Sequence, residues 1–260
     1  MIDNKPYAAK PGTQHAAAWD EVRSAVGATF GDVVSLGEMN ILVEGVVDQV
    51  LLAGASCGCE GSQPLLDLSR TSIVPFQHDR ELERLLHASA EEQRRAVVVV
   101  DSDQGGDDHA QVAGKFGVPV IRVRDCQGGA REIEDLVAES TYVEAVNQHY
   151  EESRLEWFSP IRVEAVAEAL TSSSITDRID DLFSTSFPHD GDEPRKLDKA
   201  GVAIRLAQRI DEGTVAQEDV SGLTALLGRC RQALDQAPPV MRAPRRRERV
   251  SQGARAAARH

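Results

Sequence analysis

Features that mark several common protein classes are missing from this chain of 260 residues. Its longest apolar run is far shorter than a membrane span, and residues 1–13 contain no apolar signal core. Four cysteines are few for the length, and Cys57-Gly-Cys59 has neither the spacing nor the partner pair of a structural zinc site. We therefore expect a cytoplasmic protein with reduced thiols and no association with a membrane.

Motifs of two enzyme classes are also absent. No Gly-x-x-x-x-Gly-Lys-Ser/Thr sequence occurs, so we expect no P-loop and no ATP site within the chain. No Ser-His-Asp arrangement can be identified. Four of the histidines show no metal-ligand spacing and are assigned no role: His78, His109, His149 and His189.

Positive charge is scarce and concentrated at one end. The net charge is −13, which argues against a basic surface that wraps nucleic acid. Residues 242–260 alone carry seven arginines and one glutamate, a net +6, so the preceding 241 residues carry −19. This basic tail can contact phosphates or can be a solvated end, and we favour the solvated end.

The most informative stretch is 96–107, AVVVVDSDQGGD. Its continuous apolar run is typical of a buried parallel strand, and Asp101 and Asp103 follow where that strand ends. Residues two apart on an extended chain point the same way, so the two carboxylates would repel each other. A hard divalent cation, Mg2+ or Mn2+, relieves that repulsion, while Gly105 and Gly106 let the chain turn away.

Strand and helix patterns alternate around this stretch. The alternation predicts a Rossmann-like parallel sheet with helices on both faces, and it places ligands at the carboxyl ends of the strands. Glu44 and Asp101 both stand at such ends. The expected strands are 40–44, 71–76, 96–100 and 118–123, and the expected helices are 46–55, 79–94 and 108–116.

The second half of the chain has helical patterns but no convincing strand. Residues 131–146 are expected to be a helix broken near Ser140, and further helices are expected near 161–170, 175–183, 199–211 and 220–234. The predicted organisation is α/β with an α-helical appendage. Its parts are a lead-in with a helix over 19–30 (residues 1–31), an α/β domain (32–150), a helical subdomain (151–236) and a disordered basic tail (237–260).

Three acidic motifs occur in order: Glu44-Gly45-Val46-Val47-Asp48, Asp101-Ser102-Asp103 and Ile133-Glu134-Asp135. Together they resemble the Toprim domain of the overcoming-lysogenization-defect (OLD) family of nucleases, over roughly residues 32–147. The resemblance implies a Toprim fold and metal-dependent cleavage of DNA phosphodiester bonds, usually with two ions. Five carboxylates supply enough oxygen ligands for a two-ion site.

The resemblance also assigns roles to individual residues. Glu44 and Asp101 are the firmest metal ligands, Asp48 and Asp103 follow, and Glu134 belongs to the third motif. On the helix predicted there, the neighbours Glu132 and Asp135 would face elsewhere. We therefore expect both to be solvated, with Asp135 a candidate for an outer position around the site.

The sequence around 197–207 resembles the family's later helix that bears a lysine. A lysine ammonium can stabilise charge on a pentacovalent phosphate, which makes Lys199 a candidate catalytic residue beside Glu44 and Asp101. Lys196 is a nearby competitor, and Gly201 is unfavourable for a helix start.

Alternatives remain at this point. Known members of the family carry an ABC-type ATPase domain before the Toprim domain, so we expect either a carboxyl-terminal region or a stand-alone relative that uses such a partner. The chain could instead be a non-catalytic Toprim module that binds DNA or a partner ATPase. A haloacid-dehalogenase phosphatase also has Asp-x-Asp after a strand, but that scheme does not explain Glu44 with Asp48. Primase-like or topoisomerase-like chemistry needs machinery that the chain does not display.

Overall fold

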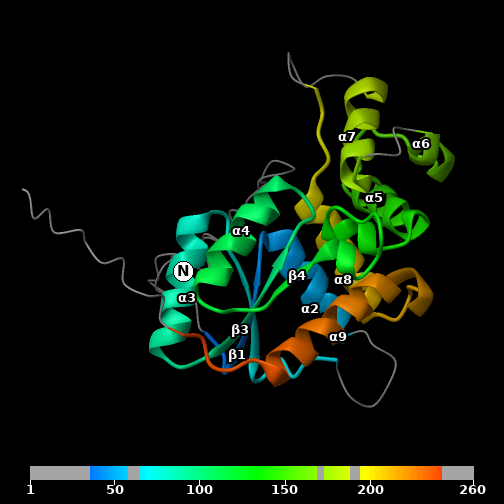
Figure 1. Cartoon of the computed structure of the whole chain (residues 1–260). Helices are drawn as coiled ribbons and strands as arrows, with labels where there is room; N and C mark the ends of the chain where they lie inside the picture. Colours follow the sequence, from blue (N-terminus) through cyan, green and yellow to red (C-terminus); the bar gives the residue numbers. More distant parts are fainter. Residues whose placement is uncertain (1–35, 58–64, 169–172, 188–193, 242–260) are drawn as a thin grey trace, which may run out of the picture.

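The computed structural model describes residues 36–57, 65–168, 173–187 and 194–241, and its centre is a four-stranded sheet (Figure 1). The strand order is β2-β1-β3-β4, and every pairing is parallel. The predicted α/β class with a parallel sheet is therefore confirmed, whereas the helix predicted over 19–30 lies outside the described residues. The strands are β1 (Met39–Val43), β2 (Thr71–Pro75), β3 (Arg95–Val100) and β4 (Val120–Arg122).

Helices cover both faces of the sheet, as the alternation of strand and helix patterns predicts. In Figure 1, α3 (Asp79–Glu91) and α4 (Gln104–Lys115) lie to the left of the sheet, and α2 (Val46–Cys57), α8 (Lys199–Asp211) and α9 (Ser221–Gln236) lie to the right. Alternate residues of β3 enter different cores because successive side chains point to opposite faces. The α2 side takes Val97 and Val99, and the α3 side takes Ala96, Val98 and Val100.

The helices of the second half pack directly on the α/β part of the chain. Buried residues of α8 and α9 belong to the same apolar core as α2 and the sheet. The predicted appendage therefore shares that core with the sheet. None of the helices in the described ranges is long and apolar enough to cross a membrane. The remaining helical elements are η1 (Val123–Asp125), η2 (Ile133–Leu136), α5 (Glu139–Glu152), α6 (Val163–Glu168), α7 (Ile175–Ser186) and η3 (Gln217–Val220).

Helix α4 begins four residues earlier than the sequence predicts. Asp103 is its N-cap, because the Asp103 Oδ1 atom accepts a hydrogen bond of 2.8 Å from the backbone N–H of Gly106. A Cβ on Gly106 would lie 2.1 Å from the carbonyl oxygen of Asp101, so a glycine is required for this close approach. The tight turn fixes the direction in which the chain leaves β3.

The helix predicted over 131–146 is wrong in its first part. Glu132 has an extended backbone, a 3-10 turn follows at η2, and α5 begins only at Glu139. The cause is the Asp135 side chain, whose Oδ2 atom accepts hydrogen bonds from the N–H groups of Arg131 and Glu132, at 2.8 and 3.1 Å. These bonds close a capped turn where the sequence pattern predicts a continuous helix.

The predicted disordered tail starts too early. Residues 237–241 belong to the fold: Val240 is buried in the core on the α3 side, and its N–H donates a hydrogen bond of 2.8 Å to the carbonyl of Arg94. The remaining part of the predicted tail, 242–260, lies outside the described residues.

Candidate active site

The two central strands bring the first two acidic motifs together. Glu44 follows β1 and Asp101 follows β3, and these strands are neighbours in the sheet. The backbone N–H of Asp101 donates a hydrogen bond of 2.9 Å to the Glu44 Oε1 atom. The two residues with the firmest sequence assignment are thus adjacent at the carboxyl edge of the sheet, where parallel α/β proteins bind ligands.

Two further elements add carboxylates to this edge. Asp48 lies in the first turn of α2, where its Oδ2 atom accepts a hydrogen bond of 3.1 Å from the N–H of Gly45. Glu134 lies in η2 and is only 4% exposed. The negative charges of Asp48, Glu44, Glu132 and Glu134 all act on Asp101, so the structure gathers residues from all three acidic motifs.

Burial and mutual repulsion make these carboxyl groups weak acids. The pKa of Asp48 is raised to about 7, that of Glu134 to about 8 and that of Asp101 to about 9. In each case burial is the largest cause and neighbouring carboxylates add to it. Burial also raises the pKa of Glu44. The described surroundings therefore provide too little positive charge for all of these carboxyl groups to ionise together at neutral pH.

Lys199 is the lysine that the structure brings to the cluster. It lies in the first turn of α8, and its Nζ atom is 3.2 Å from the Glu132 Oε2 atom. Burial works to lower the pKa of Lys199, but Glu132 and Glu134 outweigh it and the pKa is raised. Lys196 is exposed and uses its backbone carbonyl to accept a 3.4 Å hydrogen bond from the Tyr150 hydroxyl.

Close packing explains why a glycine, Gly201, occurs in the first turn of this helix. A Cβ at Gly201 would lie 2.2 Å from the Cε1 atom of His149, so a larger residue would push α8 away from α5. The Asp198 side chain caps the helix by accepting a 3.0 Å hydrogen bond from the Gly201 N–H. The residue that is unfavourable for a helix in isolation is what allows Lys199 to approach the cluster.

The expectation that Glu132 is solvated is wrong. Glu132 accepts a short hydrogen bond from the Thr176 hydroxyl as well as one from Lys199, and its charge acts on Asp101 and Glu134. Asp135 has a structural role, because its Oδ1 atom accepts a 2.8 Å hydrogen bond from the Ile175 N–H and ties η2 to α7. The two-residue spacing of Glu132 and Glu134 is the sequence signal that could have identified Glu132.

Asp103 is placed differently from the other predicted ligands. It is exposed, and one of its oxygens is engaged as the N-cap of α4. Its charge acts on Glu44 at the outer rim of the cluster. The sequence predicts that Asp101 and Asp103 present their carboxylates to one small volume. The structure places the two differently, because the Asp103 Oδ1 atom is held by the Gly106 N–H as the N-cap of α4.

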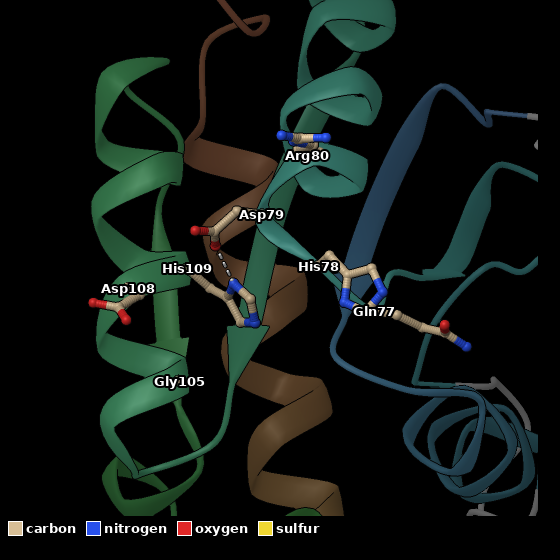
Figure 2. A pocket seen from close by; sticks show the side chains of 7 residues that line it. All are labelled: Gln77, His78, Asp79, Arg80, Gly105, Asp108 and His109. Atoms are coloured by element: carbon tan, nitrogen blue, oxygen red, sulfur yellow. Dashed lines mark hydrogen bonds and ion pairs between the residues drawn. The ribbon is translucent and has the colours of Figure 1, made fainter.

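A second, open side of the site lies between α3 and α4. A hollow of about 500 Å3 is lined by the seven residues shown in Figure 2, among them Asp79 and His109. The His109 Nδ1 atom is 2.6 Å from Asp79 Oδ1, and its Nε2 atom is 3.9 Å from Glu44 Oε2. Metal-ligand spacing along the sequence does not single out His109, because Asp79 and Glu44 come from distant parts of the chain.

The carboxylate oxygens of this cluster are the kind of ligand that a hard divalent cation prefers. Carboxylates whose pKa values lie well above normal are oxygen donors that lack a counter-charge. Near Glu134, the fully buried Tyr142 hydroxyl has no hydrogen-bond partner among the described residues. No three Asp, Glu, His or Cys side chains in the described ranges already form a ready-made cage for an ion. The residues that would hold a cation are Glu44, Asp48, Asp101 and Glu134.

Comparisons of the chain with protein-family models, with curated proteins and with solved structures find no match. Its functional assignment therefore depends on the acidic residues and on where the fold places them.

Proposed function

We propose that this protein is a metal-dependent DNA endonuclease of the OLD Toprim type, which hydrolyses phosphodiester bonds. The observation that carries the proposal is the convergence of three sequence motifs at the carboxyl edge of β1 and β3. The first motif contributes Glu44 and Asp48, the second Asp101 and the third Glu134. A lysine from a fourth segment joins them. Such a mixture of clustered carboxylates and one ammonium is suited to phosphoryl-transfer chemistry.

Each residue of the cluster has a role in this proposal. Two divalent ions, Mg2+ or Mn2+, supply Lewis-acid stabilisation of the attacking and leaving oxygens when they are bound. Glu44, Asp48, Asp101 and Glu134 would hold these ions, with Asp103 at the rim. The Lys199 ammonium, oriented by Glu132 at 3.2 Å, stabilises negative charge that develops on the phosphate.

The raised pKa values support a site that is incomplete without cations. A carboxyl with a pKa of about 8 or 9, such as Glu134 or Asp101, retains its proton at neutral pH until a cation displaces it. Bound cations would supply the positive charge that a DNA phosphate needs at this site. An ABC-type ATPase, as a partner or a further domain, belongs to the same proposal.

The test is cleavage of supercoiled plasmid DNA by the purified chain. We expect nicked and linear products with Mg2+ or Mn2+ and none with EDTA. Asp48→Asn should abolish cleavage, whereas the matched control Asp235→Asn, which changes an exposed carboxylate on α9, should cleave normally. DNA retention without cleavage under any of these metals would instead identify a non-catalytic Toprim module.

A further inference from the structure

His109 is held in a fixed orientation on the wall of the hollow between α3 and α4 (Figure 2). Its Nδ1 atom is 2.6 Å from the Asp79 Oδ1 atom. Its ring packs edge-on against the ring of Phe76, with the centroids 5.1 Å apart and the planes at 90°. The side chain of His109 is 14% exposed, so one polar and one apolar contact fix a largely buried ring.

This orientation determines which ring nitrogen is available. A carboxylate can only accept a hydrogen bond, so Asp79 requires the proton of the imidazole to be on Nδ1. In the neutral ring the lone pair is then on Nε2. That atom is directed towards the Glu44 Oε2 atom, 3.9 Å away.

The oxygens of Glu44 are divided between two partners. Oε1 accepts the 2.9 Å hydrogen bond from the Asp101 N–H, which leaves Oε2 to face His109. Two acceptor atoms thus face each other at a distance too long for a direct hydrogen bond. Two metal–ligand bonds of about 2.1 Å span up to about 4.2 Å, so one cation can reach both atoms.

We propose that His109 Nε2, together with Glu44 Oε2, is a ligand for a divalent transition-metal cation and that Asp79 positions the imidazole for it. Carboxylate–histidine–metal arrangements of this kind are the usual way in which a ligating imidazole is oriented. A nitrogen ligand favours Mn2+ over Mg2+, since Mg2+ prefers oxygen alone. The inference rests on the metal site of the proposed function and not on the cleavage of DNA.

The experiment is pulsed electron paramagnetic resonance of the protein loaded with Mn2+, which detects a directly bound 14N nucleus. We expect nitrogen coupling in the wild type and none in His109→Gln. The Mn2+ affinity of His109→Gln should fall about 10- to 100-fold, while its Mg2+ affinity should change by less than about threefold. Asp79→Asn keeps the imidazole and should weaken Mn2+ binding by about tenfold.

Two controls keep the result interpretable. His78→Gln removes an exposed histidine that lines the same hollow, and it should leave both the coupling and the affinity unchanged. Thermal melting checks that each variant is folded, and Asp79→Asn alters a half-exposed carboxylate if His109→Gln fails to fold.

The outcomes separate this inference from the proposed nuclease. Bound Mn2+ without nitrogen coupling, or coupling that persists in His109→Gln, overturns the role of His109 and leaves DNA cleavage as a separate result. Nitrogen coupling in a protein that does not cleave DNA supports His109 and overturns the nuclease. A protein that binds no Mn2+ overturns both.

Discussion

The candidate active site has two sides that differ in how their charges are compensated. The inner side consists of Asp48, Asp101, Glu132 and Glu134 with Lys199, and three of its carboxyl groups have pKa values raised to between about 7 and 9. The outer side consists of Asp103, Asp79 and His109, and its two carboxylates each have a partner: Asp103 caps α4 and Asp79 binds His109.

Glu44 connects the two sides through its two oxygens. Oε1 faces the inner side through Asp101, and Oε2 faces His109 on the outer side. On the outer side, each carboxylate has a hydrogen-bond or ion-pair partner within the protein. On the inner side, the carboxyl groups lack enough such partners, so a bound cation would have to compensate their charge. The inner carboxyl groups are half-buried or, for Glu134, buried, and they raise one another's pKa values. Their removal should therefore affect cation-dependent properties most.

The largest expected effect is that of Asp101→Ala. Metal-supported cleavage should fall to background, because the change removes the carboxylate at the centre of the inner side. Without metal, the melting temperature should hold or rise, because the change removes a carboxyl group that is costly to bury, while stabilisation by added metal should shrink. Cleavage assays and thermal melts with and without Mn2+ check this. Normal cleavage by a folded variant would remove Asp101 from the site.

Lys199→Ala tests the cation of the inner side. We expect the cleavage rate to fall by about 100-fold, with metal affinity unchanged or slightly tighter, because an ammonium is not a ligand for a cation. Lys199→Arg should rescue poorly, since a planar guanidinium does not reproduce a compact charge. Single-turnover rates and metal titrations measure the two effects separately.

Lys196→Ala is the matched control, because Lys196 is exposed and no side-chain contact joins it to the inner side in the described residues. An inactive Lys196→Ala with a normal Lys199→Ala would mean that the loaded protein uses the other lysine. Normal cleavage by both would leave the chemistry to the carboxylates and metals alone.

The pH dependence of stability tests the inner side without any assay of activity. The folded protein retains protons on Asp48, Glu134 and Asp101 up to pH values of about 7, 8 and 9, whereas the unfolded chain loses them near pH 4. The folded state therefore binds more protons in this interval, and stability falls as pH rises through it. In EDTA we expect the melting temperature to fall by at least about 4 °C between pH 6 and pH 9.

The comparison variant for this experiment is Asp101→Asn, which cannot ionise. Its decline in melting temperature between pH 6 and pH 9 should be shallower than that of the wild type, and added Mn2+ should flatten the decline of the wild type. Identical slopes for the two proteins would contradict the raised pKa of Asp101.

The inner side was largely predictable from the sequence, and the outer side was not. The apolar run of β3 identifies a buried strand, and carboxylates that follow parallel strands meet at one edge whatever the details of packing. The positions of Glu44 and Asp101 could therefore be predicted from the order of strands and helices along the chain alone. Glu132 was missed because its position depends on a turn capped by Asp135, which interrupts a helical pattern.

The role proposed for His109 could not be predicted from the sequence for a different reason. Its partners Asp79 and Glu44 are 30 and 65 residues away along the chain. They come together only because α3, α4 and the end of β1 meet in the fold. Spacing along the sequence can relate residues within one element, whereas Asp79, His109 and Glu44 come from three different elements. Lys199 could be predicted in part. The resemblance to a family suggested this lysine, but only the close packing at Gly201 explains how it reaches the cluster.

The smallest expected effect compares the two aspartates of a single motif. Asn is as good an N-cap as Asp, so Asp103→Asn should keep the hydrogen bond to the Gly106 N–H and leave the melting temperature unchanged. Because Asp103 is exposed at the rim, we expect cleavage to fall by less than about tenfold. Asp101→Asn, in contrast, should lower cleavage to background.

A third variant separates capping from ligation. Asp103→Ala loses the cap and should cost about 1 kcal/mol of stability, which a thermal melt detects, while its cleavage at a temperature well below melting should match that of Asp103→Asn. If Asp103→Asn is instead as inactive as Asp101→Asn, then Asp103 must turn towards the ions when they bind. In that case Asp103 acts as a ligand in the same way as Asp101, and the distinction between the two sides does not hold for catalysis.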